Sequence, residues 1–160
     1  MAKRPRLTHL DATGAVRMVD VGAKPVTPRE ATAEAFVRVS AAARRLVAAG
    51  RLSKKGSPLE VARIAGIQAA KRTAELIPLC HPLPISYANV RVTAVRGGYR
   101  VLATVRVQGQ TGVEMEALMA ASVAALTIYD MLKSSDRAMI VERLRLLEKS
   151  GGRSGRYQAR

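Results

Sequence analysis

The chain runs from Ala117 to Tyr129 without a single charge, and this stretch is almost entirely apolar. A helix drawn through it is apolar on every side, and such a helix must be buried against other protein. Two acids, Glu114 and Glu116, precede the stretch, where they would stabilise the positive end of a helix dipole. Asp130 and Lys133 follow it three residues apart, which places both side chains on one face. The pattern predicts a buried helix that ends in a charged pair.

Two further helices are predicted from similar opening signals. Thr27–Glu30 and Ser57–Glu60 each combine a capping residue, a proline at the first helical position and a glutamate at the third. After the first signal, apolar residues recur at helical spacing until Gly50, so we expect a helix there. After the second, the same spacing continues towards Leu76. Pro78 ends this helix, because proline disfavours a helical backbone in the residue before it.

Beyond these helices the apolar pattern alternates with a period of two. Residues 89–94 and 101–107 alternate in this way, and Gly97-Gly98 stands between them. The arrangement is typical of an antiparallel hairpin with one face packed inside. A strand is also predicted at Arg143–Leu147, and an early one at Arg17–Val21. Helices on one side of a mostly antiparallel sheet make an α+β domain.

The composition fits a single globular domain over residues 1–160. The chain is 48% hydrophobic with a mean hydropathy of +0.02, which is enough to bury a core. The uncharged stretch is shorter than the ~20 residues of a membrane span, and the basic amino terminus lacks the apolar segment of a signal peptide. The single cysteine, Cys80, suits a reducing compartment. We therefore expect a cytoplasmic protein with no membrane partner.

The net charge of +15 is compatible with three interpretations. Nucleic acid is the common partner of basic chains, a phosphorylated small molecule is a second possible partner, and a surface that only keeps the protein soluble is the third interpretation. Part of the charge lies at the two ends, at about 1–6 and 150–160, which we interpret as basic, mobile tails. Aromatic side chains on which bases could stack are scarce. Charge alone leaves a basic nucleic-acid-binding module open as the alternative to an enzyme.

The charged pair that ends the predicted helix is the first candidate for catalysis. In apolar surroundings a lysine such as Lys133 loses its proton more readily, while a neighbouring carboxylate such as Asp130 holds the proton on. Together they can tune a general acid or base. The simpler alternative is an exposed ion pair at a helix end.

Three other segments could contact a ligand. Cys80 and His81 are adjacent and point to opposite sides of an extended chain, so a dyad between them is not expected. Cys80 then fits a small buried apolar group, and His81 is a site candidate. The basic loop Arg51–Gly56 is either solvated or an anion contact ahead of a helix N-terminus. The chain has no nucleotide-binding loop of the GxxxxGK[ST] type and no GxSxG nucleophile elbow. It also has no HExxH pair, so no metal site is predicted.

Seven sequence blocks occur in order over nearly the whole chain: LTHLD (7–11), MVDVGAK (18–24), ARIAGIQAAKRT (62–73), LIPLCHPL (76–83), TGVEMEAL (111–118), AASVAALTIYDM (120–131) and RLLEKSGGRSG (145–155). Together they closely resemble the MoaC family of molybdenum cofactor biosynthesis. Several blocks are so long that a chance match does not explain them.

The resemblance implies a ferredoxin-like α+β fold and a homohexamer built as a trimer of dimers, with active sites at dimer contacts. It implies a lyase that converts 3′,8-cyclo-7,8-dihydroguanosine 5′-triphosphate to cyclic pyranopterin monophosphate and releases pyrophosphate. A radical S-adenosylmethionine enzyme makes that substrate from GTP. No redox step is implied, so no organic cofactor is expected, and Mg²⁺ could ride on the substrate phosphates.

Site residues carry over from the family position by position. Asp130 and Lys133 match the catalytic aspartate and lysine, and Lys55 matches a further pocket lysine. The substrate-binding positions are Leu79, Cys80, His81, Met115 and Glu116, with Glu114 and Lys71 as additional ones.

Two departures from the family pattern affect this assignment. Lys54 and Lys55 stand where the family often has one lysine, so either could be the pocket lysine. Arg153 replaces a tail lysine, which keeps the charge and changes the geometry. For the assembly, we predict that Lys55 of one subunit approaches the Asp130 and Lys133 end of another.

Overall fold

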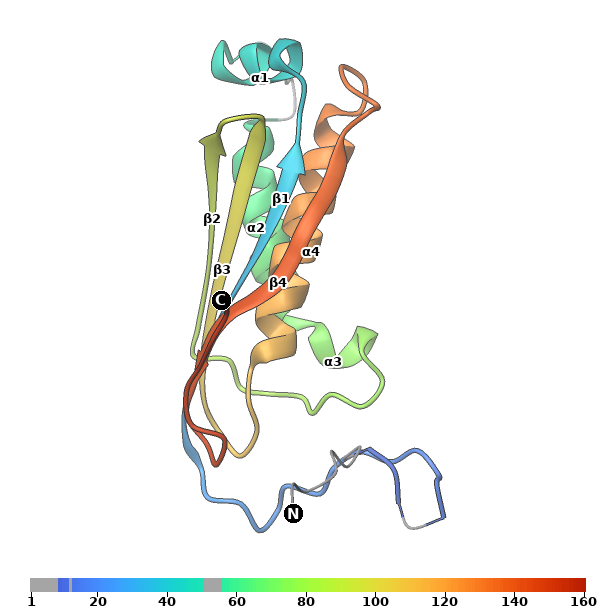
Figure 1. Ribbon diagram of the computed structural model, residues 1–160, viewed down its shortest axis with the longest axis vertical. Helices are drawn as coiled ribbons and strands as arrows, with labels where there is room; N and C mark the ends of the chain where they lie inside the picture. Colours follow the sequence, from blue (N-terminus) through green and yellow to red (C-terminus); the bar gives the residue numbers. More distant parts are fainter. Residues whose placement is uncertain (1–8, 12, 51–55) are drawn as a thin grey trace.

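The fold is one antiparallel sheet with helices packed against it (Figure 1). The computed structural model describes residues 9–11, 13–50 and 56–160. Within them, the elements in chain order are β1 (Thr27–Arg38), α1 (Ala41–Ala48), α2 (Pro58–Lys71), α3 (Thr73–Leu76), β2 (Tyr87–Val95), β3 (Gly98–Gly109), α4 (Glu114–Leu132), β4 (Ile140–Ser150) and β5 (Tyr157–Gln158). The strands lie in the order β2-β3-β1-β4-β5. Without α1, α3 and β5, the chain order β1-α2-β2-β3-α4-β4 is the split βαβ arrangement of ferredoxin-like folds. The predicted α+β class is confirmed.

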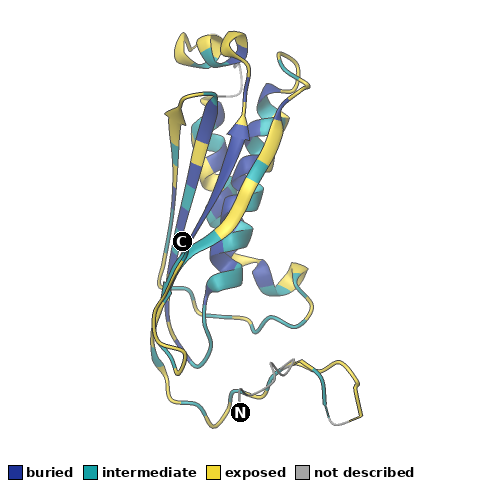
Figure 2. Cartoon of the chain, viewed as in Figure 1, coloured by how far each residue is buried: buried dark blue, intermediate teal, exposed yellow. Residues whose placement is uncertain are grey.

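The core lies between the sheet and the two long helices, α2 and α4 (Figure 2). Alternate residues of the two central strands face the helices and are fully buried, namely Ala31, Ala33, Ala35 and Val37 on β1 and Val101, Ala103 and Val105 on β3. The small side chains on β1 leave room for α4, which packs against it. In the folded chain every second residue of these two strands is thus buried against the helices, as expected for strands in the centre of a sheet.

The helices α2 and α4 pack closely at Gly66. A Cβ atom at this position would lie 2.7 Å from the carbonyl oxygen of Ala120 and 3.1 Å from the Cβ of Ala124, so only glycine allows the approach. The two helices are antiparallel (Figure 1). The start of α2 consequently lies near the end of α4, and the end of α2 lies near the start of α4. The molecule has two ends, and each brings together different segments.

The helix α4 confirms the predicted buried helix, although one side of it is exposed in the single chain. Its buried residues include Ala120, Ala124 and Ile128, whereas Leu126 is 58% exposed. Within the described part of the chain, α4 is the one helix that is long and apolar enough to cross a membrane, judged by length and composition alone. Its packing on α2 and the sheet is that of the core helix of a soluble protein.

The helix predicted from Thr27 to Gly50 is wrong over its first half. Residues Thr27–Arg38 form β1, and only Ala41–Ala48 are helical. The opening residues imitate a capping box, and alanine favours helices. However, the alanines alternate with Glu30, Thr32 and Glu34, so the strand buries one face in the centre of the sheet. Tertiary burial has overridden local propensity here.

The early strand predicted at Arg17–Val21 is also wrong. That segment has no ladder partner, and an isolated bridge joins Val16 to Leu10 just ahead of it. Met18, within the segment, is 48% exposed and is therefore not buried against the sheet. The β2–β3 hairpin and β4 are confirmed. The second predicted helix is confirmed as α2, but it ends at Lys71, and the residues towards Leu76 form the separate short helix α3. The carboxy-terminal segment adds the two-residue strand β5 to the edge of β4.

The sheet face turned away from the helices is polar. Glu34 lies at its centre, accepts a hydrogen bond from Nε of Arg145 at 2.9 Å, and accepts another from Nε of Arg100 at 2.8 Å. Burial raises the pKa of Glu34, but these two arginines outweigh it and hold the pKa below its ordinary value. The strands thus carry ion pairs on one face and the core on the other.

Candidate active site

The predicted substrate-binding residues come together in a cavity of about 290 Å³ at the end of the molecule where α4 begins. Its walls include Leu79, Cys80 and His81 from the segment after α3, and Met115 and Glu116 from the first turn of α4. A third wall comes from four residues that precede β1, namely His9, Val19, Val21 and Lys24. Segments far apart in the sequence therefore meet in one cavity.

Glu116 is the buried acid of this site. Its side chain belongs to the first turn of α4, and the residue is 4% exposed. Burial, with a smaller contribution from the nearby Glu114, raises its pKa to about 7. A carboxyl group with this pKa is present in both protonation states at neutral pH, so it can donate or accept a proton.

The two neighbours Cys80 and His81 have different surroundings. Burial, and the negative charge that Glu116 carries when ionised, raise the pKa of the Cys80 thiol, so the thiol keeps its proton at neutral pH. His81 also lines a smaller cavity of about 120 Å³, together with Glu116 and Lys71. The predicted position Lys71 thus lines a cavity together with the same acid. Cys80 contributes a protonated thiol to the cavity wall, and His81 and Lys71 contribute polar side chains.

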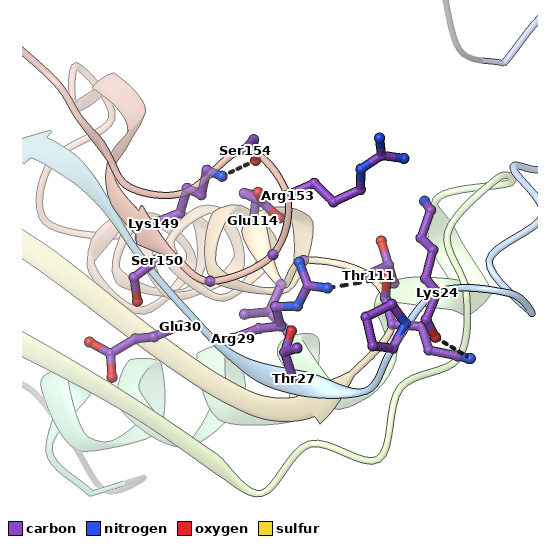
Figure 3. A pocket seen from close by; sticks show the side chains of 16 residues that line it. Lys24, Thr27, Arg29, Glu30, Thr111, Glu114, Lys149, Ser150, Arg153 and Ser154 are labelled. Carbon is purple, nitrogen blue, oxygen red and sulfur yellow. Dashed lines mark hydrogen bonds between the residues drawn. The ribbon is translucent and has the colours of Figure 1, made fainter.

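A second cavity, of about 650 Å³, adjoins the first and shares Lys24 and Thr111 with it (Figure 3). Four cationic side chains line it, from the segment before β1, from β1, from β4 and from the turn after β4: Lys24, Arg29, Lys149 and Arg153. Its acids are Glu30 and the predicted Glu114. Such a cavity favours an anionic ligand.

One polar atom in the wall of the larger cavity has no partner among the described residues. The hydroxyl Oγ1 of Thr27 is buried there without a hydrogen bond. Buried hydroxyl groups are nearly always hydrogen-bonded. An oxygen of a bound ligand would satisfy this group.

Asp130 and Lys133 lie at the other end of the molecule. Nζ of Lys133 donates to Oδ1 of Asp130 at 2.7 Å, and the two side chains are 59% and 68% exposed. The hydrogen bond and the charge of Asp130 raise the pKa of Lys133 above its ordinary value. In the single chain the pair is therefore exposed, and the apolar surroundings expected from the sequence are absent from it. The fourteen residues from Glu116 to Asp130 separate the pair from the cavity by roughly 20 Å along the helix axis.

The predicted pocket lysine, Lys55, and its alternative, Lys54, lie outside the described residues. The helix that precedes them, α1, is at the Asp130 end of the molecule (Figure 1). There the backbone N–H of Ser40 donates to Oδ2 of Asp136, just after α4, at 2.7 Å. The start of α1 is thus held at that end.

Comparison with known proteins settles the family. The model of the MoaC family matches residues 18–152. This chain belongs to the MoaC family. It is 57% identical over 157 residues to the cyclic pyranopterin monophosphate synthase of Parvibaculum lavamentivorans, covering 97% of this chain and 98% of that protein. The enzyme of the same name from Methylobacterium sp. is 58% identical over 155 residues, with 96% of each chain covered, and that from Herpetosiphon aurantiacus is 57% identical over 154 residues, covering 95% of this chain and 93% of the relative.

The MoaC-family match covers both ends of the molecule and most of the cavity walls. Reasoning from sequence missed several of these wall residues, namely His9, Lys24, Arg29 and Lys149 as well as the orphan hydroxyl of Thr27. A signal existed for three of them, because His9 lies in the LTHLD block, Lys24 ends the MVDVGAK block and Lys149 lies in the RLLEKSGGRSG block. Arg29 and Thr27 lie in Thr27–Glu30, which was interpreted as the start of a helix and not as part of a binding site.

The described part of this MoaC-family chain offers no group of three His, Cys, Asp or Glu side chains that could hold a metal ion. The acids that line the two cavities are Glu116, Glu114 and Glu30, and cationic and apolar residues make up much of the remaining walls. The residues present are therefore suited to proton transfer and anion binding.

Proposed function

We propose that this chain is a cyclic pyranopterin monophosphate synthase of molybdenum cofactor biosynthesis. It converts 3′,8-cyclo-7,8-dihydroguanosine 5′-triphosphate to cyclic pyranopterin monophosphate and releases pyrophosphate. Relatives of that name, at 57% identity or more over nearly the full length of both chains, support the activity. A radical S-adenosylmethionine enzyme supplies the substrate, and the reaction takes place in the cytoplasm.

The observation that carries the mechanism is the buried acid Glu116 beside a cation-lined cavity. Opening and reclosing ring C–N bonds requires proton transfers, and a carboxyl group whose pKa is about 7 can make them in both directions. His81 lines the same cavity, where it would orient the nucleobase of the substrate. Lys24 and Lys149 line the adjoining cavity and would hold the phosphate oxygens and stabilise the departing pyrophosphate.

The complete site requires a second copy of the chain. If Asp130 and Lys133 act on the same substrate as Glu116, they cannot come from one chain, because about 20 Å of helix lies between them. The pair from one subunit would have to meet the cavities of its neighbour. Burial at that contact would remove water from Lys133 and favour loss of its proton, while Asp130 opposes the loss. The site is therefore made of two halves, one from each end of the molecule.

Exposed apolar residues on the two long helices support this assembly. Leu126 on α4 is 58% exposed and Ile64 on α2 is 57% exposed, on the layer that the sheet does not cover. Exposed apolar surface of this kind is typical of subunit contacts. We propose the homohexamer, a trimer of dimers, as the arrangement that buries this layer and joins the two half-sites.

No organic cofactor is needed, because the reaction involves no net redox change. The substrate phosphates could carry Mg²⁺ without a dedicated protein cage. In that arrangement Mg²⁺ would enter with the substrate. Lys24 and Lys149 would hold phosphate oxygens that do not contact the Mg²⁺.

The test is turnover of the purified cyclic nucleotide triphosphate, followed by chromatography of the pterin product and by release of pyrophosphate. Lys133→Ala should abolish product formation while the oligomer stays intact by light scattering. Arg137→Ala, which removes an exposed cation near the same helix end, is the matched control and should keep its activity. Full turnover by Lys133→Ala would remove that lysine from the mechanism, and no turnover by the wild-type chain would refute the function.

A further inference from the structure

A turn of two glycines packs directly on the side chain of Arg29. Gly151 and Gly152 follow β4 with φ angles of 95° and 70°, a region that favours glycine. A Cβ at Gly152 would overlap Nη1 of Arg29, and a Cβ at Gly151 would overlap the carbonyl oxygen of Pro28. The absence of side chains is therefore what lets this turn lie against β1.

The same guanidinium group also bonds the end of β3. Its Nε donates to the carbonyl oxygen of Gly109 at 3.3 Å, and its Nη2 lies 3.4 Å from the carbonyl oxygen of Gln110 (Figure 3). The side-chain amide of Gln110 in turn donates to the carbonyl oxygens of Gly22 and Lys24, at 3.1 and 2.9 Å. Arg29 thus links three separate wall segments, which are residues 22–25, 109–114 and 150–154.

Each of these segments presents a charged side chain to the larger cavity. Lys24 belongs to the first and Glu114 to the second. Lys149 and Arg153 flank the glycine turn of the third, and Nζ of Lys149 donates to Oγ of Ser154 across it. Lys149 is placed by the ladder between β4 and β1, where it pairs with Ala31. Its spacing from Arg153 therefore depends on where the glycine turn between them lies.

We infer that Arg29 is a positioning residue, whose guanidinium group holds the glycine turn and the entry to α4 in register so that Lys149 and Arg153 face the cavity together. The inference rests on the proposed function. The planar fork of arginine reaches two carbonyl oxygens and offers a flat surface to the turn. A lysine would keep the charge and lose both features.

The experiment is a double-mutant cycle of Arg29→Ala and Gly152→Ala, with kcat and KM measured separately for the cyclic nucleotide triphosphate. Each single change should lower kcat/KM about tenfold or more, mainly by raising KM, because both displace the turn from the guanidinium. The double variant should be at most about twofold worse than the weaker single variant, since the contact can be lost only once. A double variant whose loss is the product of the two single losses would overturn the inference.

Two further variants separate positioning from other roles. Arg29→Lys should be as defective as Arg29→Ala, whereas recovery by the lysine would mean that only the positive charge matters. Arg63→Ala, which breaks an exposed ion pair on α2, is the control and should match the wild type. If Arg29→Ala does not fold, as judged by circular dichroism and light scattering, Arg29→Lys takes its place in the cycle. Wild-type turnover in the same assay keeps a failure of this inference distinct from a failure of the proposed function.

Discussion

Replacing Glu116 by glutamine should make the protein more stable at alkaline pH and leave its stability nearly unchanged at acid pH. The carboxyl group is 4% exposed, and its pKa is raised to about 7 chiefly by burial. In the unfolded chain the same group is in water, where a glutamate has a pKa near the ordinary value of 4.5. The folded state therefore binds this proton more tightly than the unfolded state does.

The sign and size of the effect follow from this difference. Between about pH 4.5 and 7 the folded chain keeps the proton and the unfolded chain has lost it, so the free energy of unfolding falls as pH rises. At about 1.4 kcal/mol per pKa unit, ionised Glu116 costs about 3 kcal/mol above pH 7. Below pH 4.5 both states are protonated and the cost is absent. Glu116→Gln keeps the shape and cannot ionise, so it removes the cost.

Urea denaturation at a series of pH values from 4 to 9 measures the effect. The free-energy difference between Glu116→Gln and the wild type should grow with pH through the interval from 4.5 to 7, in favour of the variant, and then level off. Glu114→Gln is the control, because it removes a carboxylate two residues away and leaves the buried acid in place. A difference that does not change with pH would show that Glu116 is not a buried acid with a raised pKa, and the mechanism built on it would fail.

Three further predictions concern catalysis, assembly and nucleic acid. Asp130→Asn should lower the pKa of Lys133 towards its ordinary value, because it removes the charge that raises it, and should lower turnover by about 10²-fold or more; unchanged kcat across the pH profile would contradict this. Light scattering should give a hexamer, and a monomer would refute the shared site. Filter binding at physiological salt should find only weak, nonspecific and salt-sensitive binding to RNA or DNA, whereas nanomolar, sequence-selective binding would favour the nucleic-acid alternative.

The elements predicted correctly are those whose sequence pattern and tertiary burial agree. The uncharged stretch of α4 could only be a buried helix, and the β2–β3 hairpin alternates around Gly97-Gly98. The strand β1 could not be recognised in the same way, because its buried face consists largely of alanine, which is favourable in helices and only weakly apolar. A capping signature at Thr27–Glu30 then completed a false helix. Nothing local indicates that this segment lies in the centre of a sheet.

The candidate site was predictable in part. The contiguous blocks that contain His81 and Glu116 were identified by their resemblance to the family, and the structure brings them into one cavity. The cation-lined cavity was not predicted, because Lys24, Arg29 and Lys149 come from segments that meet only in the folded sheet. The separation of Lys133 from Glu116 could be predicted, since both belong to one predicted helix and the rise of about 1.5 Å per residue fixes the distance between them.

The most direct test of the central claim, that the site is shared between chains, mixes two inactive variants from opposite ends of the molecule. Lys133→Ala lacks the pair at the end of α4, and Glu116→Gln lacks the buried acid at its start. After subunit exchange, demonstrated by mass spectrometry of differently labelled chains, about one site in four should combine two intact halves, and activity should recover to about a quarter of the wild-type value. A mixture of Lys133→Ala with Asp130→Asn, whose defects lie at the same end, should stay inactive. No recovery in the opposite-end mixture despite full exchange would contradict the shared site.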